Sequence, residues 1–284
     1  MALPIPSIIA VAGCVAVSLG CGGKARAHGS EHEQIVAITA ALEKKPGDPG
    51  LLLLRAGLHR LHKDWEAAAL DIAAAEKAGA GAGALALART EVAASRLDWD
   101  AALRELPALA RELPENAEAW RLAASVHTAR GKHAEAIAAW RAVSKFALPL
   151  RPEDVISLAR ALHAAGADDD AIATLDAGSQ RLGEISVFLE EAAQIEEGRQ
   201  RWDAALARFD RLIAQSPNSP RWLARKADLA EKAARPELTA TTRRAALVAI
   251  EALPPARRAT PAFAELEKIL RAQLAETPSA DPPR

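Results

Sequence analysis

Apolar residues recur every three or four positions through most of the chain, in helix-length segments that are separated by short turns. In residues 31–42 the apolar positions share one helical face: Ile35, Ile38, Ala41 and Leu42. Residues 260–274 repeat this pattern with Phe263, Leu266, Ile269, Leu270 and Leu274. Such spacing is typical of amphipathic helices that bury one face. The pattern therefore predicts an all-α fold.

A short motif recurs at nearly constant spacing between these two segments. Its first residues, Trp65, Trp99, His133, Asp168 and Trp202, are 34, 34, 35 and 34 positions apart. Three residues after each comes an alanine: Ala68, Ala102, Ala136, Ala171 and Ala205. A large apolar residue follows four positions later: Ile72, Leu106, Trp140, Leu175 and Phe209. Prolines at 46, 114 and 217 separate several of the units.

A period of 34 with this order of small residue, large residue and proline resembles the tetratricopeptide repeat (TPR), a helix-turn-helix unit. In the third unit, the positions where the family usually has Trp, Leu, Gly and Tyr are held by Trp120, Ala123, Ala124 and His127. The resemblance implies a right-handed superhelical solenoid, in which the two helices of a unit touch where small residues face each other, as Ala124 and Ala136 would.

The resemblance divides the chain into units. We expect repeats at about 49–80, 83–114, 117–149, 152–183 and 186–217, and a degenerate repeat at 220–253. Helices at 31–44 and 260–275 would cap the two ends, because a solenoid must cover its terminal apolar faces. Residues 276–284 are predicted to be a disordered tail.

Residues 1–20 are predicted to be a signal peptide, because an apolar run at 8–19 is too short to span a bilayer. The segments that end at Cys14 and Cys21 each resemble the lipobox of bacterial lipoproteins, in which the cysteine is acylated. Cys21 is favoured, since it leaves an apolar run of ordinary length, and residues 21–30 would then be a flexible tether. The alternatives are acylation at Cys14 and a plain secretory signal cleaved near residues 25–27. Gly22, rather than Asp, after the cysteine resembles outer-membrane sorting.

Composition and charge narrow the possible functions. Roughly one residue in four is alanine, aromatic residues make up 4% and tyrosine is absent, which disfavours a β-rich fold. The net charge of −1 gives no footprint for nucleic acid. Both cysteines lie in the predicted signal segment, so the mature chain would have no disulfide and no cysteine-based site.

No pattern in the chain indicates an enzyme or a cofactor. The sequence has no G-x-S-x-G, no H-E-x-x-H and no phosphate-binding loop. His28 with His32, and His59 with His62, could each meet on a helix, but two imidazoles without a third ligand make a weak metal site. The acidic run at 168–170 suits a helix N-terminus. We therefore expect no catalytic residue, no metal and no cofactor.

The resemblance also implies a groove lined by the first helix of each unit, which would bind a segment of a protein partner. Carried over by position, its residues are Arg60, Glu91, Glu118, Arg121, Glu153, Arg160, His163, Glu190, Gln194, Glu197, Asp228 and Glu231. The middle of this groove is expected to be mixed to basic in charge and its far end acidic.

The expected function is a non-catalytic interaction scaffold of the bacterial cell envelope. It would be held by a lipid anchor, at the outer membrane facing the periplasm, or else secreted as a soluble protein. Two alternatives stay open at this point. The chain could be an accessory subunit of a neighbouring envelope enzyme, or a histidine-based metal-binding protein.

Overall fold

The computed structural model describes residues 25–276. Cys14, Cys21 and the predicted signal peptide lie outside the described residues, as do residues 277–284 of the predicted tail. The first helix begins at Ala25, so residues 25–30 of the predicted tether are helical. Among the described residues, no helix combines the length and the apolar character that crossing a membrane requires.

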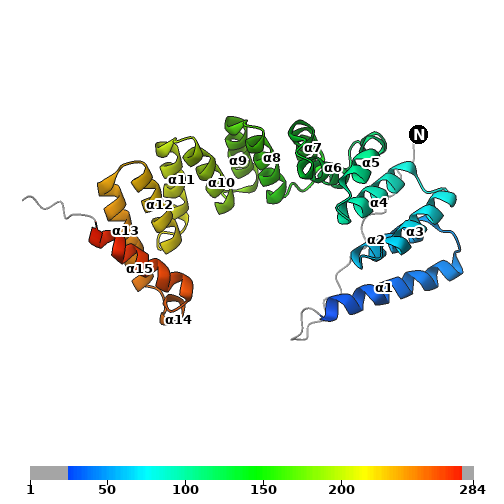
Figure 1. The fold of residues 1–284 in the computed structure, drawn as a ribbon, viewed down its shortest axis with the longest axis horizontal. Helices are drawn as coiled ribbons and strands as arrows, with labels where there is room; N and C mark the ends of the chain where they lie inside the picture. The colour runs from blue at the N-terminus through cyan, green and yellow to red at the C-terminus, as the bar shows by residue number, and fades with distance from the viewer. Residues whose placement is uncertain (1–24, 277–284) are drawn as a thin grey trace, which may run out of the picture. The chain divides into compact units, whose positions relative to one another are not determined.

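Residues 25–276 form fifteen helices and no strand (Figure 1), which confirms the predicted all-α fold. The helices are α1 (Ala25–Lys44), α2 (Pro49–Leu61), α3 (Trp65–Lys77), α4 (Ala82–Ser95), α5 (Trp99–Glu112), α6 (Ala117–Ala129), α7 (His133–Phe146), α8 (Pro152–Ala164), α9 (Asp168–Leu182), α10 (Ser186–Gly198), α11 (Trp202–Gln215), α12 (Pro220–Lys232), α13 (Pro236–Glu251), α14 (Pro255–Arg258) and α15 (Pro261–Glu276).

The helices begin where the sequence supplies caps. Side-chain oxygens of Asp48, Asp64, Asp98 and Asn116 accept hydrogen bonds from backbone N–H groups in the first turns of α2, α3, α5 and α6. Such bonds satisfy donors that have no partner within the helix. Proline occupies the first turn of α2, α8, α12 and α13, where a missing N–H costs nothing. One element was not expected: Pro255 starts the short helix α14 instead of only ending α13.

The turn inside each helix pair has the same backbone shape. One residue per turn adopts a positive φ, and these residues keep the spacing of the sequence motif: Lys63, Leu97, Gly131, Gly166, Gln200 and Ala234. In the turn before α7, the N–H of Lys132 reaches back to the carbonyl of His127 at 2.9 Å, and Arg235 makes the equivalent bond to Ala230. These bonds occupy carbonyls at the end of the first helix. The conformation recurs whether or not the residue is glycine.

Consecutive helices pack as pairs, with α2 on α3, α6 on α7, α8 on α9, α10 on α11 and α12 on α13. Nearly all the surface of the alanines predicted at these contacts is buried, as for Ala124 and Ala136. Trp140 and Phe209 are also buried, while Trp65, Trp99, Trp120 and Trp202 are half-buried. Close contact through small side chains lets two helix backbones approach each other.

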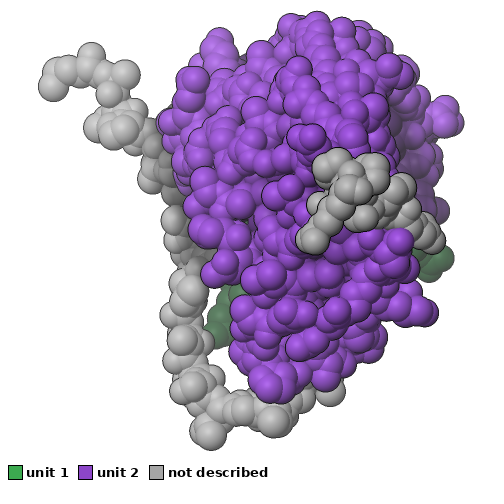
Figure 2. Space-filling view, turned by 90° about the vertical axis from the view of Figure 1, so that its left-hand side faces the viewer, with its two compact units in different colours: residues 1–95 green, residues 96–284 purple. Residues whose placement is uncertain are grey.

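The chain divides into two compact units, residues 1–95 and residues 96–284 (Figure 2). In the first, α1 and α4 pack on the α2/α3 pair around Leu42, Leu52, Ile72 and Leu85. In the second, α15 packs on α13 and buries Leu270 against Ile250. The division falls between α4 and α5, inside the repeat predicted at 83–114.

The strained turn generates a prediction about stability. A positive φ costs an L-residue about 1–2 kcal/mol, and glycine gives back about 0.4–1 kcal/mol through the freedom of the unfolded chain. We therefore expect Ala234→Gly to raise the free energy of unfolding by about 0.5–1 kcal/mol. Urea unfolding measures this change.

The neighbouring Ala233 is the matched control, because its φ of −78° is ordinary. Ala233→Gly should lower the stability, as glycine does at any unstrained position. The reverse change, Gly131→Ala, should also destabilise, although a Cβ there would meet nothing within 4 Å. Equal effects of the two alanine-to-glycine changes would show that the turn stores no strain.

Candidate functional site

Ion pairs connect the first helix of one unit to the first helix of the next in residues 96–284. We call the surface that α6, α8, α10 and α12 share through these pairs the first-helix surface. The pairs join side chains about one repeat apart: Arg121 with Asp154, Arg151 with Glu118, Arg160 with Glu191, Arg221 with Glu190, and Arg225 and Lys232 with Glu197. Most residues predicted to meet a partner therefore already have one within the chain.

Arg121 is bound most firmly. Its guanidinium donates from Nε and Nη2 to the two oxygens of Asp154, each at 2.7 Å. The side chains of Arg121 and Asp154 are only 13% and 4% exposed. Burial alone raises the pKa of Asp154, but hydrogen bonds from Arg121 and from the N–H of Arg151 outweigh it, so the pKa is lowered. Arg121, predicted to line the groove, thus holds α6 to α8.

A hollow of about 260 Å³ lies between α8 and α10. It is lined by Arg160, His163, Glu191, Gln194 and Ile195, so it brings together three residues that the sequence predicted for the groove. His163 Nδ1 is 2.6 Å from Asp168 Oδ1 at the start of α9. Arg160 pairs with Glu191 but leaves 66% of its side chain exposed. The charged groups at this hollow can be reached by a partner.

The predicted acidic end of the groove carries cations that the sequence analysis missed. Arg221 lies 2.7 Å from Glu190, and Lys232 lies 2.5 Å from Glu197. Arg225 approaches Glu197 to 3.3 Å. The expected separation of a mixed-to-basic middle from an acidic end is therefore largely cancelled. Charges of opposite sign about one repeat apart were the signal that could have revealed these pairs.

Gln194 and Asp228 differ from their neighbours. Both occupy the ninth position of their predicted units, and within residues 25–276 neither side chain makes a hydrogen bond or an ion pair. Burial raises the pKa of Asp228, although Arg225 and Arg243 act against this rise. These two groups retain unused hydrogen-bonding capacity on the first-helix surface.

The remaining predicted residues fall in three places. In the unit of residues 1–95, Arg60 pairs with Glu91 at 3.4 Å and donates to Ser95 at 3.3 Å. Glu153 lies in the first turn of α8. Glu231 accepts a 2.7 Å hydrogen bond from the buried Arg243 of α13. In the part of the chain that the structure describes, no group of three histidine, cysteine or acidic residues could hold a metal ion.

The contrast between Arg121 and Arg160 can be measured. Arg121→Ala leaves a buried carboxylate without its partner, which costs about 3–5 kcal/mol. Arg160→Ala removes an exposed pair and should cost less than about 1 kcal/mol. Urea unfolding of the two variants at pH 7 tests this difference; similar losses of stability would contradict the assigned roles.

The same variants should differ in pH dependence. The lowered pKa of Asp154 means that its contribution is complete above the ordinary carboxyl pKa and is lost as pH falls through the lowered value. The stability difference between wild type and Arg121→Ala should therefore shrink in acid.

The sequence matches no family model and no curated protein. The fold is similar to that of several solved structures. The C-terminal part of a TPR repeat-containing protein from Cytophaga hutchinsonii superposes with a TM-score of 0.63 at 13% identity, over 80% of this chain and 93% of that one. YrrB, described as a TPR protein with an unusual peptide-binding site, gives 0.53 at 16% identity, over 64% and 93%.

A third structure, a TPR protein from Parabacteroides merdae, gives a TM-score of 0.50 at 14% identity, over 87% of this chain and 94% of that one. Identities this low establish the fold alone. They agree with the repeat spacing, the recurring turn and the paired packing of helices. The chain therefore has the TPR-like solenoid fold that its repeat predicts.

Proposed function

We propose that this chain is a non-catalytic scaffold that binds a segment of a partner protein on the first-helix surface of α8, α10 and α12. The observation that carries the proposal is the unused capacity of Gln194 and Asp228, one repeat apart and on consecutive first helices. YrrB, which shares the fold, is described as having a peptide-binding site, and this supports the proposal.

The chemistry of the surface suits an extended peptide. The amide of Gln194 both donates and accepts, so it can pair with the C=O and N–H of a peptide backbone. Asp228 accepts hydrogen bonds, and a donor from the partner would offset the burial that raises its pKa. Arg160 and His163 at the adjoining hollow would add contacts to acidic or polar side chains.

We further propose that the protein works at the cell envelope, anchored through acylated Cys21 to the outer membrane. Support comes from the lipobox-like residues before Cys21 and from the apolar run at 8–19. Several acyl chains give lasting membrane attachment, whereas one gives only marginal binding. Secretion as a soluble protein is the alternative outcome of the test below.

The partner surface is tested with Asp228→Asn. We expect a peptide selected from a random library on the full chain to bind this variant, and Gln194→Ala, about tenfold more weakly, because each loses a hydrogen bond. Glu265→Gln, an exposed acid on α15, is the matched control and should bind as the wild type does. Equal binding by the double variant would exclude this surface.

Asp228→Asn should also stabilise the free protein at pH 7. A raised pKa means that ionising Asp228 costs stability once the pH passes the ordinary Asp value, and that the cost is complete above the raised value. Thermal unfolding should show a higher Tm for the variant at pH 7 and little difference at pH 3. A residue that lowers stability yet binds the partner fits a site kept for function.

The anchor is tested with single cysteine variants. In cells fed an alkyne-labelled fatty acid, Cys14→Ala should remain labelled and in the membrane fraction, whereas Cys21→Ala should lose both properties. The opposite result would assign the anchor to Cys14. A wild-type chain that is exported without label would indicate an ordinary secretory signal.

A further inference from the structure

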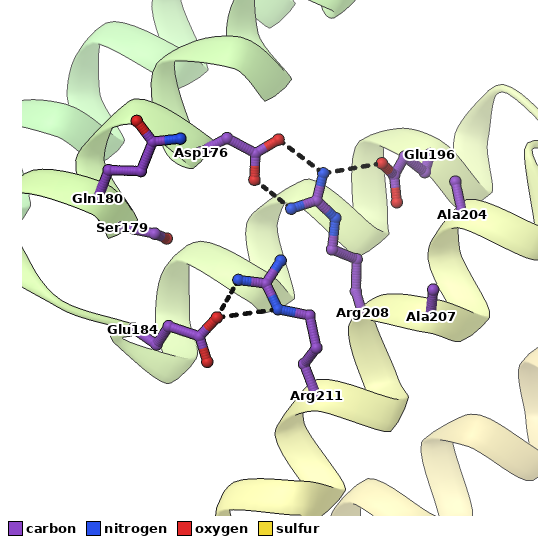
Figure 3. A pocket seen from close by; sticks show the side chains of 9 residues that line it. All are labelled: Asp176, Ser179, Gln180, Glu184, Glu196, Ala204, Ala207, Arg208 and Arg211. Carbon is purple, nitrogen blue, oxygen red and sulfur yellow. Dashed lines mark hydrogen bonds and ion pairs between the residues drawn. The ribbon is translucent and has the colours of Figure 1, made fainter.

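A second hollow lies between α9 and α11, the second helices of two consecutive units (Figure 3). Its volume is about 640 Å³, larger than the hollow between α8 and α10. Side chains of α9 form one wall and those of α11 the other, while Glu196 reaches it from α10. We call it the second-helix hollow. None of its residues belongs to the predicted groove, so it is independent of the proposed function.

Two arginines of α11 cross this hollow and are held by carboxylates. Arg208 donates to both oxygens of Asp176 and, at 3.2 Å, to Glu196 Oε1. Arg211 donates to Glu184, with its Nε at 3.0 Å. Hydrogen bonding to Asp176 raises the pKa of Arg208 despite its burial, so its guanidinium stays charged. Three carboxylates against two guanidiniums leave the hollow with a net negative charge.

Glu196 is not fully paired. The residue is only 4% exposed, and its Oε2 atom has no hydrogen-bond partner within residues 25–276. Ser179 Oγ, on the α9 wall, is likewise buried without a partner in the described chain. A buried acceptor without a donor loses its hydration and gains nothing in return. The hollow therefore lacks a donor at two of its atoms.

The position of Glu196 in the repeat adds a second indication. The equivalent residues one unit before and one unit after are Leu162 and Ala230, both of which are buried and apolar. The fold thus tolerates an apolar side chain at this position. A buried ion pair is often no more stable than such an apolar residue. The charge on Glu196 is consequently not explained by packing.

We propose that the second-helix hollow binds a primary ammonium group on a flexible alkyl chain, as carried by a lysine side chain of a partner or by a small aliphatic diamine. The unpaired atoms accept hydrogen bonds, and the net charge of the hollow is negative. Single oxygen atoms suit a compact ammonium better than a planar guanidinium, which prefers both oxygens of a carboxylate. The small side chains of Ala204 and Ala207 leave room for the methylene groups.

Calorimetry on the full chain with three probes tests the chemistry. Nα-acetyl-lysine methylamide should bind, and its norleucine counterpart, which has the same alkyl chain without the charge, should bind at least about tenfold more weakly. Cadaverine distinguishes the two sources: tighter binding of the lysine derivative indicates a protein partner, and tighter binding of cadaverine a free amine. No binding of either amine, or equal binding of norleucine, would overturn the proposal.

Variants test the location. Ala207→Leu fills the hollow from an exposed position and keeps every ion pair, so amine affinity should fall at least about tenfold while the Tm is unchanged. Ala214→Leu, an exposed change on the same helix away from the hollow, is the matched control. Ser179→Ala should weaken binding without disturbing Arg208. Unaltered amine affinity in both Ala207→Leu and Ser179→Ala would place the binding elsewhere and overturn the assignment.

Discussion

The close approach of paired helices is the constraint on which the rest of the structure depends. It requires small residues at the contact, and alanines such as Ala124 and Ala136 are almost fully buried there. At Gly178 in α9 the approach is closer still, since a Cβ would lie 2.6 Å from Val155 and 3.3 Å from Phe188. Because each unit buries its apolar face only against its neighbours, this separation also sets the distance between consecutive units.

That distance places first helices within reach of each other's long side chains, and ion pairs about one repeat apart follow from it. The pairs separate residues that hold the fold from residues that can bind something else. Arg121 is held by Asp154 at two oxygens and is nearly buried, whereas Gln194 and Asp228 have no partner in the described chain. A polar residue at a groove position is thus open to a ligand only where the adjacent unit supplies no opposite charge.

Both candidate sites lie where a local rule of the fold is broken. Asp228 is a partly buried carboxylate with a raised pKa, and Glu196 is a charge at a position where other units place leucine or alanine. Each lowers the stability of the free chain relative to an apolar or neutral residue. The two sites lie on different sets of helices, so the chain could bind two different chemical groups.

The sequence by itself determined the helices, their pairing and the small residues at their contacts, because helical periodicity and a 34-residue period are local properties that survive without knowledge of the fold. It also identified Arg160, His163 and Gln194, which line one hollow. Only the tertiary structure decided which charges were already paired. Arg221, Arg225 and Lys232 meet their acidic partners across a whole repeat, and the unpaired Oε2 of Glu196 depends on side chains from three helices. Ion pairing depends on separations in space, which the order of residues along the chain does not contain.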